Sequence, residues 1–184
     1  MKFVELELPD AYVIEPDRFE DERGFFARLW CETEFCEQGL SAKIVQSNVG
    51  SNPKAGTLRG LHFQFAPHAE VKVLRCPRGA IFDVVVDLRP DSPTFKKWCG
   101  VALTEENGKT IYVPEGFATG YLTLVDNTEI YYHTSEFFHP ESASGVRYDD
   151  PALGIEWPEK IQLISKADQG WPDISARKEF NADR

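Results

Sequence analysis

Histidine is the side chain best suited to move protons at neutral pH, and four histidines occur in this 184-residue chain. His62 has the most informative context. It stands in the segment TLRGLHFQ, where period-2 alternation places Gly60, His62 and Gln64 on one face of a strand. Such a face is typical of a pocket lining, although a lone strand histidine is also commonly a satisfied core or surface residue. Arg59 falls on the other face unless a bulge at Gly60 redirects it.

Two aspartates interrupt an otherwise apolar run in the segment 80–88 (AIFDVVVDL). Asp87 comes near the end of the run, where an acid usually caps the strand or faces solvent. Asp83 lies in the middle, so its side chain either turns outward or lines a polar cavity. The interior of a small β barrel is where such a cavity forms.

The metal-ligating residues show no spacing typical of a metal centre. An iron or manganese site in a small β barrel typically takes two histidines two residues apart, and the chain has no His-x-His. Its four cysteines have no CxxC spacing either. We interpret them as reduced, mostly buried thiols, which indicates a cytoplasmic protein and neither a metal site nor a disulfide framework.

Composition narrows the class of protein further. With 42% hydrophobic and 27% charged residues, the chain matches globular proteins and not disordered or fibrous ones. The net charge of -10 argues against non-specific nucleic-acid binding, but a few arginines in one cleft can still hold an anionic ligand. No apolar run reaches the length of a membrane span or a signal peptide, so no membrane partner is expected.

The elements that must position these residues are predicted to be short strands. A helix is expected only at 32–38 in the first two thirds, followed by Gly39 as a stop. The segment 3–28 resembles edge strands around a turn at 21–24, and the end from 176 to 184 is expected to fray. Eight further strands without βα alternation predict a single all-β domain over 1–184, an antiparallel sandwich, jelly roll or barrel. They are 42–49, 57–65, 71–76, 80–88, 97–104, 109–113, 119–125 and 129–135.

Several of these segments together carry a resemblance to a known family. They are TLRGLHFQ at 57–64, KVLRC at 72–76, GAIFDV at 79–84, PEGFA at 114–118 and WP at 157–158, with DERGFF at 21–26 and QSN at 46–48. In this order they resemble the dTDP-4-dehydrorhamnose 3,5-epimerase family of nucleotide-sugar epimerases, from about residue 10 to 168. The resemblance implies a cupin-like jelly roll with a few short helices, no metal, no cofactor and a homodimer whose N-terminal segment crosses to the partner's pocket.

The resemblance also implies a role for each site residue. His62 resembles the general base, Asp168 the carboxylate that orients it, Tyr132 the opposing acid and Lys72 the residue that faces the sugar keto oxygen. The residues that resemble the contacts to the nucleotide and diphosphate are Arg23, Phe26, Gln46, Asn48, Arg59 and Phe138. Without the resemblance, Tyr132 is read as packing, Lys72 as solvated, and Asp168 and Arg23 as ordinary turn residues.

The implied reaction explains why these residue types are needed. A 4-keto group acidifies the hydrogens at C3 and C5 of a nucleotide-linked 6-deoxy sugar, because removal of either leaves an enolate. Imidazole is a suitable base at neutral pH, and a carboxylate partner fixes its tautomer. Inversion requires protonation from the opposite face, which a tyrosine hydroxyl can supply. The resemblance implies that the enzyme acts in deoxysugar or polysaccharide biosynthesis in the cytoplasm.

The chain departs from the family pattern near the implied site, which leaves alternatives open. Thr119 replaces a histidine in FATGY, His133 replaces a lysine after Tyr132, and Phe137-Phe138 replaces a tyrosine pair. These changes allow a single-centre 3- or 5-epimerase, with C3 favoured, or a CDP- or GDP-linked substrate. A cupin-like sugar-binding module without turnover and a metal-dependent oxygenase are alternatives from other classes.

Overall fold

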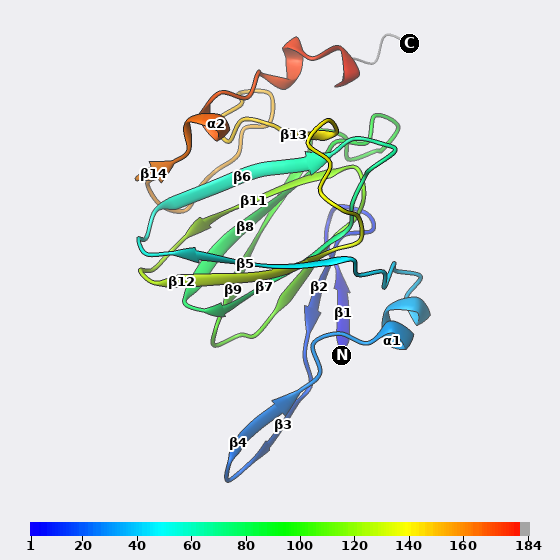
Figure 1. Ribbon diagram of the computed structural model, residues 1–184, viewed down its shortest axis with the longest axis vertical. Helices are drawn as coiled ribbons and strands as arrows, with labels where there is room; N and C mark the ends of the chain where they lie inside the picture. The colour runs from blue at the N-terminus through cyan, green and yellow to red at the C-terminus, as the bar shows by residue number, and fades with distance from the viewer. Residues whose placement is uncertain (181–184) are drawn as a thin grey trace.

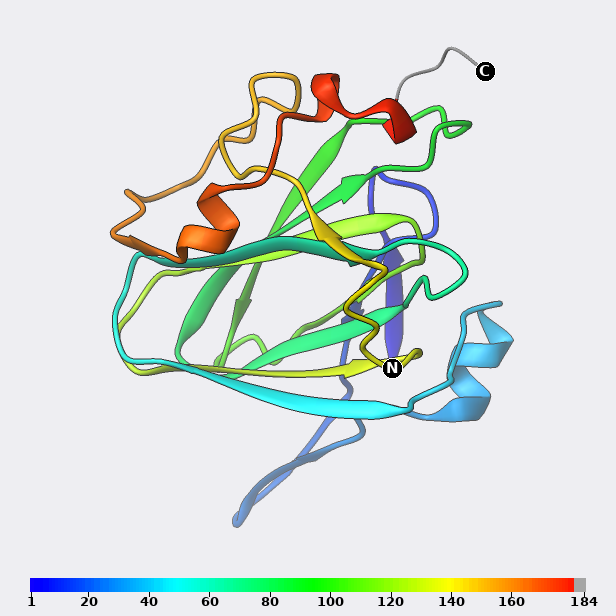
Figure 2. The same ribbon diagram turned by 45° about the horizontal axis from the view of Figure 1, so that its top comes forward.

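The computed structural model describes residues 1–180, most of which belong to two sheets that face each other (Figure 1, Figure 2). The first sheet has the order β1-β2-β10-β7-β12-β5, all antiparallel. The strands of this sheet are β1 (Lys2–Glu5), β2 (Tyr12–Glu15), β10 (Thr110–Val113), β7 (Lys72–Arg78), β12 (Thr128–Thr134) and β5 (Gln46–Asn52).

The second sheet has the order β13-β6-β11-β8-β9, with β14 paired to β6 in parallel. From β5 to β8 and again from β9 to β13, successive strands alternate between the two sheets, which is the jelly-roll pattern, and β8 and β9 pair within the second sheet. The predicted antiparallel all-β fold is therefore confirmed. The strands of this sheet are β6 (Thr57–Gln64), β8 (Ala80–Asp87), β9 (Trp98–Thr104), β11 (Phe117–Thr123), β13 (Ala143–Gly145) and β14 (Leu163–Ile164).

Helices are few and short, as expected. They are α1 (Glu32–Glu37), α2 (Lys166–Gln169) and two 3₁₀ turns at Ile174–Ala176 and Lys178–Phe180. Phe35 of α1 is buried in a cluster with β2, β7 and β10, whereas Cys36 faces solvent. The expectation of mostly buried cysteines is wrong, since only Cys76 is buried. Among residues 1–180 no helix is long and apolar enough to span a bilayer.

The core explains why β8 has an almost continuous apolar sequence. Ile81 and Val85 face the space between the sheets, while Val84 and Val86 face a second cluster on the other side of the strand. The C-terminal segment supplies part of that second cluster, as Figure 2 shows above the second sheet. A strand buried on both faces takes apolar side chains at most positions, and Asp83 and Asp87 are the buried exceptions in β8.

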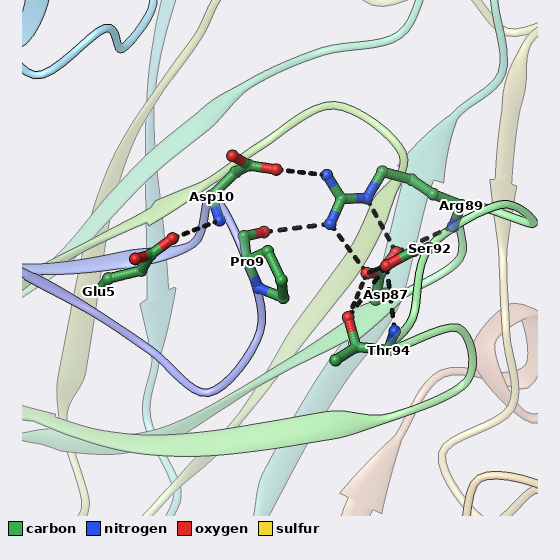
Figure 3. A network of polar contacts seen from close by, with 7 residues as sticks. All are labelled: Glu5, Pro9, Asp10, Asp87, Arg89, Ser92 and Thr94. Atoms are coloured by element: carbon green, nitrogen blue, oxygen red, sulfur yellow. Dashed lines mark hydrogen bonds and ion pairs between the residues drawn. The ribbon is translucent and has the colours of Figure 1, made fainter.

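Asp87 closes the end of β8, where its fully buried carboxylate anchors the following loop (Figure 3). It accepts hydrogen bonds from Ser92, Thr94 and both the backbone and the guanidinium of Arg89. Arg89 also contacts Asp10 in the turn between β1 and β2. Burial would raise the pKa of Asp87, but the bonds from Arg89, Ser92 and Thr94 hold it below the usual value. Of the two positions expected for Asp87, the structure therefore shows the strand cap and not a solvent-facing side chain.

An isolated two-stranded ribbon, β3 (Arg18–Asp21) and β4 (Gly24–Ala27), extends away from both sheets (Figure 1). Its turn lies at the predicted place, with Gly24 at a φ of +119°. At the other end of the chain, the expected fraying from 176 is wrong for residues 176–180. Phe180 is buried beside Phe63 and Phe65, and Arg177 donates to Gly145. Residues 181–184 lie outside the described residues.

Candidate active site

A cavity of about 730 Å³ opens between the two sheets. Both sheets contribute side chains to its walls, and the segment 163–168 closes one side. The polar side chains that line it are Thr57, Arg59, His62, Lys72, Asp83, Thr119, Tyr121, Tyr132, Ser165 and Asp168. Asp83 therefore lines a cavity, which is one of the two positions that its sequence context allows.

His62 and Asp168 form a hydrogen-bonded pair in this cavity. The Nε2 atom of His62 lies 2.6 Å from Oδ1 of Asp168. Burial, the largest influence, would raise the pKa of Asp168, but the hydrogen bond and charge of His62 hold it below the usual value. An ionised carboxylate at Nε2 fixes the tautomer and leaves Nδ1 as the nitrogen that can exchange a proton with a ligand.

The short helix α2 places Asp168 beside a strand that lies more than a hundred residues earlier. Ser165 caps this helix, since its hydroxyl accepts a hydrogen bond of 3.0 Å from the backbone N–H of Asp168. The parallel pairing of β14 with the start of β6 brings the helix against His62. The pattern Ser-x-x-Asp at 165–168 is the sequence signal for this helix start.

A bulge in β6 brings Arg59 and His62 to the same cavity. The pairing of β6 with β11 shifts register between Tyr121, opposite Arg59, and Thr119, opposite His62. Gly60 lies at the shift with a φ of +121°, and a Cβ there would lie 2.6 Å from the Cα of Gly120. Glycine is needed at this position both for its backbone conformation and for the close approach of the strands.

The buried side chain of Asn52 orients Arg59. Its Nε donates to Oδ1 of Asn52 at 2.8 Å, and Asn52 in turn donates to the Tyr121 hydroxyl and the Thr128 carbonyl. This leaves the terminal guanidinium nitrogens free to bind an anion such as a diphosphate. Asn52 and Tyr121 do not emerge from the sequence interpretation, because nothing in QSNVGSN or FATGY distinguishes support from packing.

Tyr132 and Lys72 lie on the wall opposite His62, on the first sheet. Burial raises the pKa of Tyr132, with a smaller effect from Glu70, so that its hydroxyl stays protonated at neutral pH. Lys72 forms an ion pair with Glu70 at 2.9 Å and donates to the backbone carbonyl of His62. The cavity thus has a base on one sheet and a proton donor and a cation on the other.

Asp83 and Thr119 meet at the base of the cavity. The hydroxyl of Thr119 donates to Oδ1 of Asp83 at 2.9 Å, and Oδ2 has no hydrogen-bond partner among residues 1–180. Complete burial raises the pKa of Asp83 to about 7, against smaller opposing effects from Thr119 and Lys72. A buried polar atom without a partner next to a cavity is a position where a ligand group can bind.

Comparison with known proteins identifies the family. The dTDP-4-dehydrorhamnose 3,5-epimerase profile matches residues 5–176. The chain belongs to this family. It is 43% identical to the enzyme of Methanothermobacter thermautotrophicus over 94% of each chain, and 41% identical to that of Shigella flexneri over 100% of this chain and 98% of the other. The crystal structure of the Elizabethkingia anophelis epimerase matches with a TM-score of 0.93 at 39% identity, covering 96% of this chain and 98% of that one.

The structure brings together six of the predicted site residues, namely His62, Lys72, Tyr132, Asp168, Arg59 and Thr119, the last of which departs from the family pattern. Gln64 does not join them, although simple alternation predicts it on the face of His62. The alternation itself holds, since Leu61 and Phe63 pack together on the opposite face of β6, but Gln64 lies at the end of the strand beyond the cavity. Its buried amide binds the loop at 137–139 instead.

The remaining five residues do not line the cavity of this chain. Arg23 lies at the exposed tip of the β3–β4 ribbon and pairs with Asp21. Phe26 of the same ribbon is 69% exposed. Gln46 accepts a hydrogen bond from the backbone N–H of Phe138, and Asn48 lies opposite Tyr132 in the pairing of β5 with β12. Gln46 and Asn48 thus belong to β5, which lines the cavity through Val49 and Gly50, whereas Arg23 and Phe26 lie on the ribbon away from the cavity.

Proposed function

We propose that this chain epimerises a dTDP-linked 4-keto-6-deoxy sugar at C3 and C5 by proton abstraction and reprotonation through an enolate. The observation that supports this most strongly is the position of the His62–Asp168 pair on one wall and Tyr132 on the other. Inversion needs a base and an acid on opposite faces of the sugar. The family membership supports an isomerase, and the comparisons favour the two-centre 3,5-epimerases over a single-centre enzyme or a CDP- or GDP-linked substrate.

In this mechanism Nδ1 of His62 takes the proton from C3 or C5, and the positive charge that forms is stabilised by Asp168. Tyr132, protonated because burial raises its pKa, delivers a proton to the opposite face of the enolate. His62 then releases its proton to solvent and Tyr132 regains one from solvent, after which a second half-cycle repeats these steps at the other carbon. General acid–base catalysis of this kind contributes about 10² to 10⁴ in rate.

Lys72 stabilises the negative charge that develops on the sugar oxygen. The side chain is already oriented by Glu70 and by the His62 carbonyl, so it does not have to be reorganised during the reaction. Asp83 Oδ2, which lacks a partner among residues 1–180, is placed to bind a sugar hydroxyl. The reaction as proposed needs no redox cofactor, because no electrons leave the sugar.

The nucleotide end is completed by a second copy of the chain in this proposal. Arg59 binds the diphosphate, Gln46, Asn48 and Phe138 lie at the mouth, and Arg23 and Phe26 reach the site from the partner's ribbon. The extension of β3–β4 away from both sheets and the exposure of its phenylalanines support this exchange (Figure 1). We further propose that the enzyme works in the cytoplasm as a homodimer.

Product analysis tests the proposal. We expect the chain to convert dTDP-4-keto-6-deoxyglucose into dTDP-4-keto-L-rhamnose, identified by the proton NMR couplings at C3 and C5. Tyr132→Phe removes the proposed acid without changing the shape of the wall, so turnover is expected to fall by about 10² or more. Recovery of unchanged sugar with the wild type, or equal rates for both proteins, would contradict the proposed function.

A further inference from the structure

Two loops outside the catalytic cavity bring together three side chains that commonly ligate metals. His68 lies between β6 and β7, and Glu136 and His139 lie between β12 and β13. One potential ligand atom from each of the three falls within 4.8 Å of the other two. The two imidazole rings stack with their centroids 3.5 Å apart and 12° between their planes. None of the three residues lines the cavity that holds His62.

The backbone that carries these residues is fixed by a buried side chain. The amide nitrogen of Gln64 donates to the carbonyls of His68 and Phe137, at 2.9 and 3.0 Å. Its amide oxygen accepts from the N–H of His139 at 2.7 Å. Gln64 is 4% exposed and ends β6, which itself pairs with β13. Both loops are therefore anchored to one strand, as a preorganised metal site requires.

The charges around the cluster suit a divalent cation. The backbone N–H of Phe137 donates to Oε1 of Glu136 at 2.9 Å, which fixes the position of this carboxylate. Lys43 lies 3.4 Å from Oε2 of Glu136 and is exposed, so its ammonium can move aside. A second carboxylate, Glu141, lies 3.1 Å from Nδ1 of His139. That contact leaves Nε2 of His139 for a metal, in the manner of the carboxylates that orient ligating histidines.

We propose that His68, Glu136 and His139 bind one divalent transition-metal ion of the zinc class, with Glu141 orienting His139 from outside. Two imidazoles and one carboxylate are a common ligand set for Zn²⁺, and the fourth position goes to water. Zinc–ligand distances of about 2.1 Å require ligand atoms about 3.4 Å apart in a tetrahedron. To bind one ion, the two rings must turn out of their parallel stack so that an in-plane nitrogen lone pair of each points at the metal. The bound ion ties the two loops together and takes no part in proton transfer.

Metal titration of the full-length chain tests this site. Chelator-treated protein is titrated with Zn²⁺ by calorimetry and with Co²⁺ by visible absorption, which reports a tetrahedral site. We expect one ion per chain. His68→Ala and His139→Ala should each weaken binding by about 100-fold or more, and Glu141→Gln by about tenfold. Glu136→Gln, which keeps the side-chain shape, should also lose affinity.

The matched control is His62→Ala, which removes the imidazole of the other histidine–carboxylate pair in the chain. This variant should bind Zn²⁺ as the wild type does. Amide hydrogen exchange gives an independent measurement: Zn²⁺ should slow exchange at 136–142 in the wild type and leave it unchanged in His68→Ala. Wild-type affinity in both His68→Ala and His139→Ala, or loss of binding in His62→Ala, would overturn the proposal, as would no binding by the wild type.

Discussion

At the scale of single residues, the proposed reaction depends on one hydrogen bond between an imidazole and a carboxylate. Without its partner, His62 would be free to rotate in an open cavity and to take either tautomer. Oδ1 of Asp168 at 2.6 Å from Nε2 restricts both. The same contact stabilises the imidazolium formed when the ring takes a proton from the sugar. The two residues therefore act as one unit in the proposed reaction.

Removal of either member of this pair should slow turnover. His62→Ala is expected to lower kcat by at least about 10² while binding of the sugar nucleotide persists, because Arg59 is unchanged. Asp168→Asn should also lower kcat by about 10² or more, since an amide no longer orients or stabilises the ring. Steady-state kinetics measure kcat for both variants. The control is Asp149→Asn, a substitution of an exposed acid. Near-normal rates in either variant would remove that residue from the mechanism.

Asp83 predicts a pH dependence of stability. Its pKa of about 7 in the folded chain lies above the ordinary 3.8, so the folded state holds the proton more tightly than the unfolded state. This stabilisation is complete below about pH 4 and is lost as the pH rises towards 7. The loss is up to about 4 kcal/mol, since each tenfold change in an equilibrium is about 1.4 kcal/mol.

Asp83→Asn tests this directly, because the amide keeps the volume and still accepts from Thr119. Urea unfolding at pH 4 to 8 should show the free energy of unfolding of the variant rising relative to wild type across this range. The contributions of the other titrating groups are the same in both proteins, so they cancel in the difference between the two free energies of unfolding. A difference that stays constant from pH 4 to 8 would mean that Asp83 is not protonated in the folded protein.

At the scale of elements, the β3–β4 ribbon makes a prediction about exchange between subunits. If Arg23 serves the partner's pocket, an Arg23→Ala chain and a His62→Ala chain complement each other. In the mixed dimer, one pocket combines an intact His62 with an intact Arg23 and should recover about half of the wild-type activity. Co-expression with two affinity tags isolates this mixed dimer. If Arg23 serves its own pocket, the mixed dimer stays as inactive as its parents.

Local sequence pattern predicts some of these elements and some of the site residues, but not all of them. Strand alternation and turn residues were sufficient to predict α1 and the strands from β6 to β12, because each is set by local pattern. They left Arg59 open because the bulge at Gly60 changes the face on which it lies. They misplaced Gln64 because alternation gives its face but does not show that the cavity ends before it. The pairing of His62 with Asp168 could not follow from local pattern, since the two residues are joined only by the packing of α2 on β6.

At the scale of the whole molecule, the groups proposed for proton transfer are divided between the two sheets. In the proposed reaction, the sheet that contains β6 carries the base, and the sheet that contains β7 and β12 carries the cation and the acid. The cation is Lys72, so the enolate oxygen has a partner without a metal ion. Chelator treatment should therefore leave kcat unchanged, even where it strips an ion from the 68–139 cluster. Activity lost on chelation and restored by Fe²⁺ or Mn²⁺ would contradict this assignment.

Hydrogen exchange at the sugar carbons directly tests whether His62 abstracts protons from C3 and C5. The wild type is incubated with dTDP-4-keto-6-deoxyglucose in D₂O, and the proton signals of C3 and C5 are followed by NMR. Abstraction by His62 and reprotonation from solvent-equilibrated groups predict deuterium at both carbons, and none above background with His62→Ala. Product without deuterium at C3 and C5, or the same uptake in His62→Ala as in the wild type, would contradict an enolate mechanism based on this histidine.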